Sequence, residues 1–273
     1  MASIGPTAFY TGEVWARHGL SHPELSRPEG RMLHAFTAPW FMVSRMLGGP
    51  TLDGMLLGRH RVIDAMLEDA IRPGHVGQVL EVAAGMSPRG WRFTERHPDL
   101  VYVEADLPDM AARKRAALER IGRPATHRVV ELDALAATGP LSLASVAAGL
   151  DEHTGLAIIT EGLLSYLSRD AVLELWSAFA RTLARFEHGL YLSDLHVDAD
   201  APAVLSRMFA GTLSAFVRSP VRVHFADGSE ARDALLGAGF AEASVDLASH
   251  HPAAAGLNGA ERVRIVRARS VSP

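Results

Sequence analysis

The chain has 273 residues, 48% of them hydrophobic and 21% charged, which is enough for one large α/β domain. Its net charge of −4 gives no basic footprint for nucleic acid, and the absence of cysteine excludes disulfides, thiolate metal sites and cysteine nucleophiles. No apolar run is long enough to cross a bilayer, and no basic N-terminal region precedes an apolar core, so we expect a cytoplasmic protein without a membrane partner.

Residues 1–58 are interrupted repeatedly by proline and glycine, with short aromatic and methionine-rich pieces between the breaks. Such pieces are too short to form a core alone, and we expect them to pack over the main domain as a helical cap. The main domain, residues 59–273, begins with a predicted helix at 59–71. Val62, Ile63, Met66 and Leu67 form its apolar stripe.

Strands and helices alternate through the next part of the chain. We predict strands at 78–82, 100–104, 127–132, 156–160 and 189–193, and helices at 87–96, 109–122 and 168–183. The basic run 113–115 is expected to form a solvated helix face. This order predicts a parallel sheet with helices on both faces.

The alternation stops after Asp194, and residues 201–218 are predicted to be a helical insertion that acts as a lid, within an inserted region of about 195–228. It resumes with a helix at 229–238. Strands near 243–247 and at 262–267 are then predicted to form an antiparallel hairpin at the sheet edge.

The stretch 79–90 combines a buried strand, a turn of small residues and a helix start. Ala83 and Gly85 remove side-chain bulk where the strand ends, Ser87 can cap a helix, and Pro88 fits the first helical position. Such a turn brings backbone N–H groups and a helix N-terminus close to a ligand.

Acidic residues end the next four strands, and in an open parallel sheet ligands bind at that edge. They are Asp106, Asp133, Glu161 and Asp194. Asp106 stands 21 positions after Gly85, a spacing that suits hydrogen bonds to ribose hydroxyls. The sequence therefore favours a nucleoside-like ligand.

The glycine pattern argues against a phosphate-bearing nucleotide. A dinucleotide site needs G-x-G-x-x-G, but the same register here reads Ala83, Gly85 and Pro88, and no G-x-x-x-x-G-K-[ST] is present. A ligand with ribose and adenine but no phosphate would suit an acidic rim. S-adenosylmethionine is such a ligand, and acidic walls tolerate its positive sulfonium.

Four blocks in order carry a resemblance to the leucine carboxyl methyltransferase family. They are E-V-A-A-G-M-S-P-R at 81–89, E-A-D-L-P at 104–108, E-L-D at 131–133 and T-E-G-L-L-S-Y-L at 160–167. The resemblance covers about residues 55–195. Within the family, the chain is most similar to the bacterial polyketide-type O-methyltransferase branch, and residues 7–15 and 19–23 resemble the N-terminal segment of that branch. It implies a class I methyltransferase (Rossmann-like) fold, with a mostly parallel seven-stranded sheet and an antiparallel C-terminal strand.

The resemblance also implies the residues that bind S-adenosylmethionine. The glycine and acid of the first block match Gly85 and Glu81, and the arginine that closes it matches Arg89, with a structural role. Asp106 matches the acid on the ribose, and Leu132 and Asp133 match the pair beside the adenine. Glu161 matches the acid near the methionine amino group. The arginine that meets the methionine carboxylate is Arg59 or Arg61, of which we prefer Arg59. Ala83 departs from the glycine that the family usually has.

The resemblance predicts methyl transfer to a carboxyl or hydroxyl oxygen of a small molecule. We expect no metal, because the histidines form no H-E-x-x-H pattern. A carboxylate acceptor needs no base, whereas a phenol benefits from one. The histidines considered for that role are His18, His22, His34, His196, His250 and His251. Tyr10, Trp15 and Tyr166 are considered for an apolar acceptor pocket or for core packing. Three alternatives stay open: a protein C-terminal carboxyl methyltransferase, a non-catalytic S-adenosylmethionine-binding domain and a nicotinamide-dependent oxidoreductase.

Overall fold

The computed structural model describes residues 5–26, 30–32, 51–200 and 222–270 of the chain. They contain a seven-stranded sheet in the order β3-β2-β1-β4-β5-β7-β6, in which β7 runs antiparallel to both of its neighbours. The strands are β1 (Gln78–Val82), β2 (Val101–Asp106), β3 (His127–Glu131), β4 (Leu156–Thr160), β5 (Gly189–Leu195), β6 (Glu242–Leu247) and β7 (Arg264–Arg269). The predicted parallel sheet with an antiparallel C-terminal strand is confirmed.

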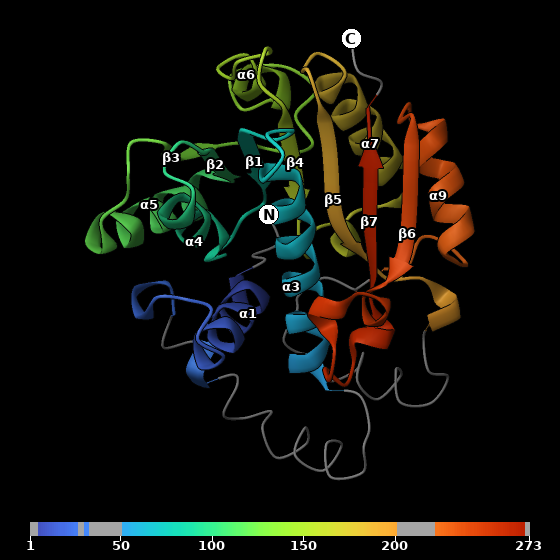
Figure 1. Cartoon of the computed structure of the whole chain (residues 1–273), viewed down its shortest axis with the longest axis horizontal. Helices are drawn as coiled ribbons and strands as arrows, with labels where there is room; N and C mark the ends of the chain where they lie inside the picture. Colours follow the sequence, from blue (N-terminus) through green and yellow to red (C-terminus); the bar gives the residue numbers. More distant parts are fainter. Residues whose placement is uncertain (1–4, 27–29, 33–50, 201–221, 271–273) are drawn as a thin grey trace.

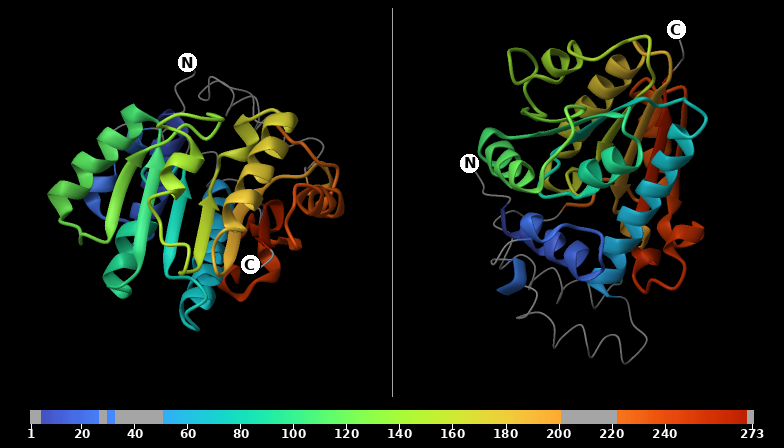
Figure 2. Two further views of the ribbon diagram at one scale, coloured as in Figure 1. Left: turned by 90° about the horizontal axis from the view of Figure 1, so that it is seen from above. Right: turned by 60° about the vertical axis from the view of Figure 1, so that its left-hand side comes forward.

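Helices cover both faces of this sheet (Figures 1 and 2). One face packs against α3 (Leu52–Ile71), α4 (Arg89–Arg96) and α5 (Pro108–Ile121), and the other against α6 (Leu143–Ala147), α7 (Arg169–Leu183) and α9 (Gly228–Gly237). The alternation of side chains along β1 shows the reason. Val79 packs with α3 and α4, whereas Leu80 and Val82 pack with α7 and α9.

Short 3-10 turns complete the described elements. They are η1 (Pro23–Leu25), η2 (Leu164–Tyr166), η3 (Asp198–Asp200), η4 (Ala248–His250), η5 (Pro252–Ala254) and η6 (Ala260–Arg262). The last three lie between β6 and β7, and η5 and η6 pack against α3. None of the helices in the described residues is both long and apolar enough to cross a membrane.

Several predicted boundaries were wrong. Helix α3 begins at Leu52 rather than at residue 59, because Thr51 caps it by accepting a hydrogen bond from the Gly54 N–H at 3.0 Å. Helix α4 begins at Arg89, since Pro88 occupies the cap position, and Ser87 stands one residue earlier with its Oγ accepting the Arg89 N–H at 3.3 Å. Strand β5 continues beyond residue 193 through Asp194, and β7 starts two positions later than predicted.

The N-terminal segment contributes α1 (Gly5–Arg17), which packs against the first turns of α3. Tyr10, Val14 and Trp15 of α1 form a buried cluster with Leu56 and Leu57 of α3. Figure 1 shows α1 beyond the end of the sheet to which the β6 arrowhead points, which is the carboxyl edge of the parallel strands. The predicted lid at 201–218 and the cap residues 33–50 lie outside the described residues.

Candidate functional site

The turn after β1 has a left-handed backbone conformation and is hydrogen-bonded to the end of β2. Gly85 has φ of 52°, and its N–H donates to Asp106 Oδ2 at 2.7 Å. The Leu107 N–H donates to the other oxygen of Asp106 at 2.8 Å. Burial raises the pKa of the Asp106 carboxyl above its ordinary value, although these two N–H groups act in the opposite direction. Two residues predicted for the site are therefore in direct contact.

The ends of β2 and β3 are joined in the same way. The Leu132 N–H donates to the Asp106 carbonyl at 2.8 Å, and the Leu132 side chain is buried. Asp133 is half-buried, and its Oδ1 accepts the Leu135 N–H at 3.0 Å. Gly85, Asp106 and Leu132 thus form one connected rim across the ends of three neighbouring strands.

A second group of charges lies at the ends of β1, β4 and β5. We call it the arginine cluster, and its members are Arg59, His60, Asp64, Glu81, Arg89, Arg92, Glu161 and Asp194. Arg89 is its centre: this fully buried guanidinium donates to Asp64 at 2.7 Å, to Glu81 at 2.5 Å and to Glu161 at 2.5 Å. Burial opposes its charge, but these three carboxylates raise the pKa of Arg89 well above its ordinary value.

Arg59 joins the ends of β4 and β5. Its Nε donates to Glu161 Oε1 at 3.0 Å, and its Nη1 donates to Asp194 Oδ2 at 2.8 Å. Asp194 Oδ1 in turn accepts the Gly162 N–H at 2.6 Å. Burial alone would favour the neutral acid at Glu161, but His60, Arg89 and Arg59 outweigh it and hold its pKa well below its ordinary value.

One donor of Arg59 stays available beside this rim. Within the described residues, no acceptor forms a hydrogen bond with Arg59 Nη2. Gly162 has φ of 73°, and a Cβ added there would lie 3.2 Å from Nη2, so glycine keeps the space in front of this nitrogen open. Arg61 is half-buried and belongs to none of the described ion pairs, whereas Arg59 reaches the ends of two strands. The geometry therefore favours Arg59 over Arg61 as the residue facing a ligand carboxylate.

Glu81 occupies a different position from the other predicted residues. It is 1% exposed, and its oxygens accept hydrogen bonds from Arg89 Nη1 at 2.5 Å and from the Tyr102 hydroxyl at 2.7 Å. A ligand at the rim would meet Glu81 only through Arg89. Its place in the structure is that of a counter-charge that orients Arg89.

His60 was not singled out by the sequence analysis, although it joins the site to α1. Its ring is fully buried, its Nδ1 lies 2.9 Å from Glu161 Oε2, and it packs against the Trp15 ring with centroids 4.6 Å apart. The spacing of His60 and Asp64 at i, i+4 on α3 was the available signal, because such residues share a helix face. Tyr10 and Trp15 are core residues of the α1–α3 contact.

The histidines considered as bases mostly lie in local contacts of their own. His22 and His251 each accept a backbone N–H two residues ahead, and His34 is outside the described residues. His196 follows β5 with its Nδ1 3.2 Å from the Arg262 carbonyl oxygen. Burial lowers the pKa of His196, and so does the charge of Arg59, although Asp194 acts in the opposite direction. The lowered pKa favours the neutral form of the His196 imidazole, and His196 stands at the carboxyl edge of the parallel strands.

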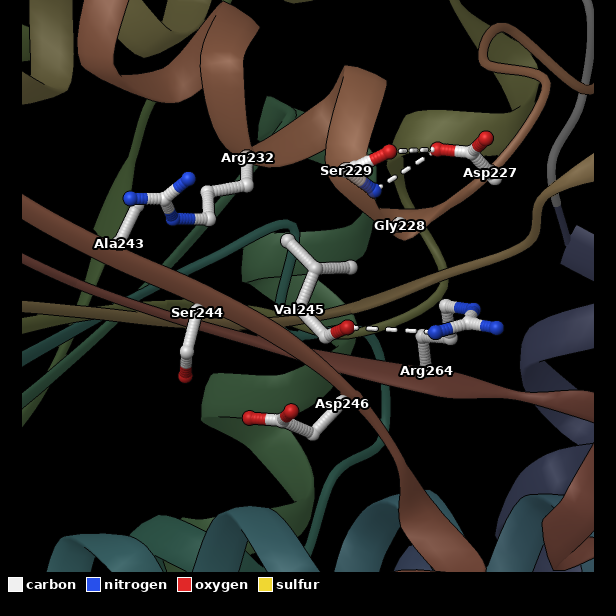
Figure 3. A pocket seen from close by; sticks show the side chains of 9 residues that line it. All are labelled: Asp227, Gly228, Ser229, Arg232, Ala243, Ser244, Val245, Asp246 and Arg264. Carbon is white, nitrogen blue, oxygen red and sulfur yellow. Dashed lines mark hydrogen bonds between the residues drawn. The ribbon is translucent and has the colours of Figure 1, made fainter.

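A hollow of about 410 Å³ lies elsewhere, between the start of α9 and the edge strand β6 (Figure 3). Asp227 caps α9 through the Ser229 and Glu230 N–H groups, and Arg264 donates to the Val245 carbonyl at 3.3 Å. None of the predicted cofactor residues lines this hollow.

The family profile of the leucine carboxyl methyltransferases matches residues 25–180. A proposed S-adenosyl-L-methionine-dependent methyltransferase of Mycolicibacterium gilvum is 36% identical over 121 residues, which are 44% of this chain and 38% of that protein. A second such protein, from Mycolicibacterium paratuberculosis, is 32% identical over 164 residues, 58% of this chain and 45% of its own length. The chain therefore spans less than half the length of these two relatives.

Two solved structures share the fold across almost the whole chain. One, a proposed methyltransferase from Thermobifida fusca, has a TM-score of 0.68 at 16% identity and covers 96% of this chain and 94% of that one. The other, a DUF574 family protein from Streptomyces avermitilis, has a TM-score of 0.68 at 13% identity and covers 97% of both chains. At such low identity these likenesses show the fold alone, which is the class I methyltransferase fold.

Proposed function

The chain belongs to the leucine carboxyl methyltransferase family, and on that premise we propose that it is an S-adenosylmethionine-dependent O-methyltransferase. The observation that carries the proposal is the joined rim at the carboxyl ends of the parallel strands. There the left-handed turn at Gly85 meets the Asp106 carboxylate at the ends of β1 and β2, and buried Arg59 of α3, whose Nη2 is available, reaches the ends of β4 and β5. Open α/β sheets bind their ligands at this edge.

The residues fit the proposed cofactor in three parts. Arg59, with Nη2 beside Gly162, faces the methionine carboxylate, and Glu161 supplies negative charge for the methionine amino group. The Gly85 turn leaves room for the methionine chain, and Asp106 accepts the ribose hydroxyls. Leu132 offers an apolar surface and Asp133 an acceptor for the adenine. Glu81 contributes by holding Arg89, which in turn holds Glu161.

The bound cofactor supplies a methyl group on a positive sulfonium, which is the electrophile. The chain's own residues fix that group, align an acceptor oxygen with it and exclude water. We propose a small-molecule acceptor with a carboxyl or hydroxyl oxygen, polyketide-like in shape, because the N-terminal segment resembles that of the bacterial polyketide-type branch and its α1 lies at the same edge of the sheet. If the acceptor is a phenol, His196 is a base that this edge offers, since its lowered pKa favours the neutral imidazole.

A protein C-terminal carboxylate is the second candidate acceptor, favoured by the family match. Calorimetric titration with S-adenosylmethionine, its demethylated product and NAD tests the cofactor, with Gly85→Val as the binding-negative control. A branched side chain is strained at φ of 52° and fills the space of the turn. Binding of NAD alone would contradict the proposal.

Methyl transfer to a panel of aromatic acids, phenols and C-terminal peptides then tests the acceptor. We expect transfer to the small molecules. Preference for peptides would establish the second candidate, and binding of cofactor without transfer to any class would favour a non-catalytic domain.

A further inference from the structure

The chain contains 26 arginines and a single lysine, Lys114. This lysine lies within the basic run expected to form a solvated face, and that expectation was wrong for it. Arg113 is exposed, whereas Lys114 is 1% exposed and points from α5 toward the sheet. Arginine thus serves at every other cationic position of the chain, and lysine occurs only where the cation is buried.

The surroundings of Lys114 connect it to the turn of the proposed cofactor site. Its Nζ donates to the Ser87 carbonyl at 2.5 Å, approaches the Gly85 carbonyl at 3.4 Å and lies 3.1 Å from Glu104 Oε1. An ammonium group has three donors, and two of them bond to these carbonyl oxygens, while Glu104 Oε1 balances the charge as an ion-pair partner without a hydrogen bond. Two of these partners belong to the turn whose Gly85 N–H binds Asp106.

Behind the ammonium, Glu104 and His127 form a buried contact. Glu104 Oε2 is 3.3 Å from His127 Nε2, and the side chains of Glu104 and His127 are buried. Burial would favour the neutral acid, but Lys114 and His127 hold the pKa of Glu104 below its ordinary value. A Cβ on Gly90 would lie 2.7 Å from both Glu104 Oε1 and His127 Nε2, so glycine leaves the space that this group needs. We call Lys114, Glu104 and His127 the lysine cluster.

We propose that Lys114 is a positioning residue for the cofactor site: it clamps the Gly85 and Ser87 carbonyls and so sets the turn that receives the methionine chain. The inference rests on the proposed function. A guanidinium is wider, planar and rigid, and cannot bring one nitrogen to two carbonyl oxygens and a carboxylate as this ammonium does. This difference explains why the one lysine of the chain stands here.

Affinity and stability separate this role from a merely structural one. We expect Lys114→Met to weaken S-adenosylmethionine binding by at least about tenfold, the usual cost of losing a charge-assisted hydrogen bond. Lys114→Arg should bind no better than Lys114→Met. The double variant Lys114→Met/Glu104→Gln removes both charges of the Lys114–Glu104 ion pair. Its thermal midpoint should therefore return toward that of the wild type, while its affinity for S-adenosylmethionine stays low. Arg113→Met, an exposed neighbour on the same helix, is the matched control and should bind as the wild type does.

Two results would overturn the assignment. Recovery of affinity in the double variant would mean that Lys114 only neutralises Glu104. Recovery in Lys114→Arg would mean that charge suffices without the convergent geometry.

A measurement without cofactor keeps this test distinct from the test of the proposed function. Because the chain has one lysine, protein labelled with ¹⁵N-lysine gives a single Nζ resonance. We expect that resonance to exchange slowly with solvent, and the Gly85 amide to exchange faster in Lys114→Met than in the wild type or Arg113→Met. A fast-exchanging Nζ, or unchanged exchange at Gly85, would refute the clamp. If the clamp is found but the wild type binds no S-adenosylmethionine, the proposed function fails and the clamp remains as a feature of the turn.

Discussion

The arginine cluster and the lysine cluster lie on the same face of the sheet and use cations of different shape. Glu81 and Glu104 are register partners on β1 and β2, and Tyr102 stands between the clusters, donating to Glu81 while its ring meets His127 edge-on. Helix α4 serves both with consecutive residues, since Arg89 enters one cluster and Gly90 makes room for the other.

The clusters differ in reach. Guanidinium groups connect carboxylates from α3, β1, β4 and β5, because each fork can bind several partners in one plane. The single ammonium gathers acceptors from one turn and one strand. The comparison indicates that the arginine cluster holds distant elements together, whereas the lysine cluster shapes a short piece of backbone.

Acid should produce the largest effect, because the buried acids of both clusters must be protonated. Glu161, Asp64 and Glu104 have pKa values lowered by their cationic neighbours, which outweigh burial. Their stabilising contribution is complete above the unfolded-state pKa values of about 4 and is lost as the pH falls through the lower folded-state values. We expect the free energy of unfolding to fall steeply below about pH 4.5.

Urea unfolding at a series of pH values measures how steeply the free energy of unfolding falls in acid. Glu161→Gln should reduce this pH dependence more than Glu104→Gln does, since His60, Arg89 and Arg59 all lower the pKa of Glu161. An equal reduction in the two variants would show that the two clusters contribute equally to the pH dependence of stability.

Removing the centre of the arginine cluster should be the most damaging single change. Arg89→Met leaves Glu81, Asp64 and Glu161 without their shared partner, and breaking a buried ion pair costs about 3–5 kcal/mol. The free energy of unfolding in urea measures the loss. Arg96→Met, on the same helix but half exposed, should cost less than about 1 kcal/mol. Similar losses in both variants would show that Arg89 is not the centre.

Changes at the rim should affect binding more than stability. Asp106→Ala removes the acceptor of the Gly85 N–H and the proposed ribose contact, so cofactor binding should weaken by about 1.5–3 kcal/mol. Calorimetry on the folded variant measures it, with exposed Asp109→Ala as the control. Glu104 is enclosed by Lys114 and His127 and cannot take over the ribose contact. Unchanged affinity in Asp106→Ala would therefore exclude a ribose site at this strand end.

Much of the fold could be predicted because buried strands appear in the sequence as apolar runs and buried helix faces as apolar stripes. The run 156–160 is a strand with every residue buried, and the stripe beginning at Val172 lies on the inner face of α7. The prediction for Lys114 was wrong because like charges in a row suggest solvent. Its helical spacing from Ala111, Ala117 and Leu118, all buried, was the better guide.

The strand ends predicted which residues of the candidate site adjoin one another, but the sequence did not predict how its charged side chains pair. Asp106 meets Gly85 as the topology requires, since the ends of neighbouring parallel strands adjoin. No spacing along the chain shows that Arg89 lies between Glu81 and Glu161, because those contacts depend on how α4 packs across the sheet. Buried charge networks of this kind become visible only in three dimensions.

The smallest expected effect concerns Ala83, the residue that follows β1. Among the described residues other than glycine, it alone has a positive φ, 56°. A left-handed alanine costs about 1–2 kcal/mol, which glycine relieves, but the added freedom of glycine in the unfolded chain offsets about 0.4–1 kcal/mol of that relief. Ala83→Gly should therefore raise the free energy of unfolding by about 0–1.6 kcal/mol.

Cofactor affinity should change little in this variant, because the Lys114 clamp and the Asp106 contact, and not the side chain of residue 83, hold the turn. Urea unfolding and calorimetry measure the two quantities. Ala84→Gly is the matched control: its φ is not positive, and glycine there should lower stability by about 0.5–1 kcal/mol. A loss of stability in Ala83→Gly as large as in Ala84→Gly would show that the turn is not left-handed at residue 83. A large gain in affinity would show instead that Ala83 strains the turn against the cofactor.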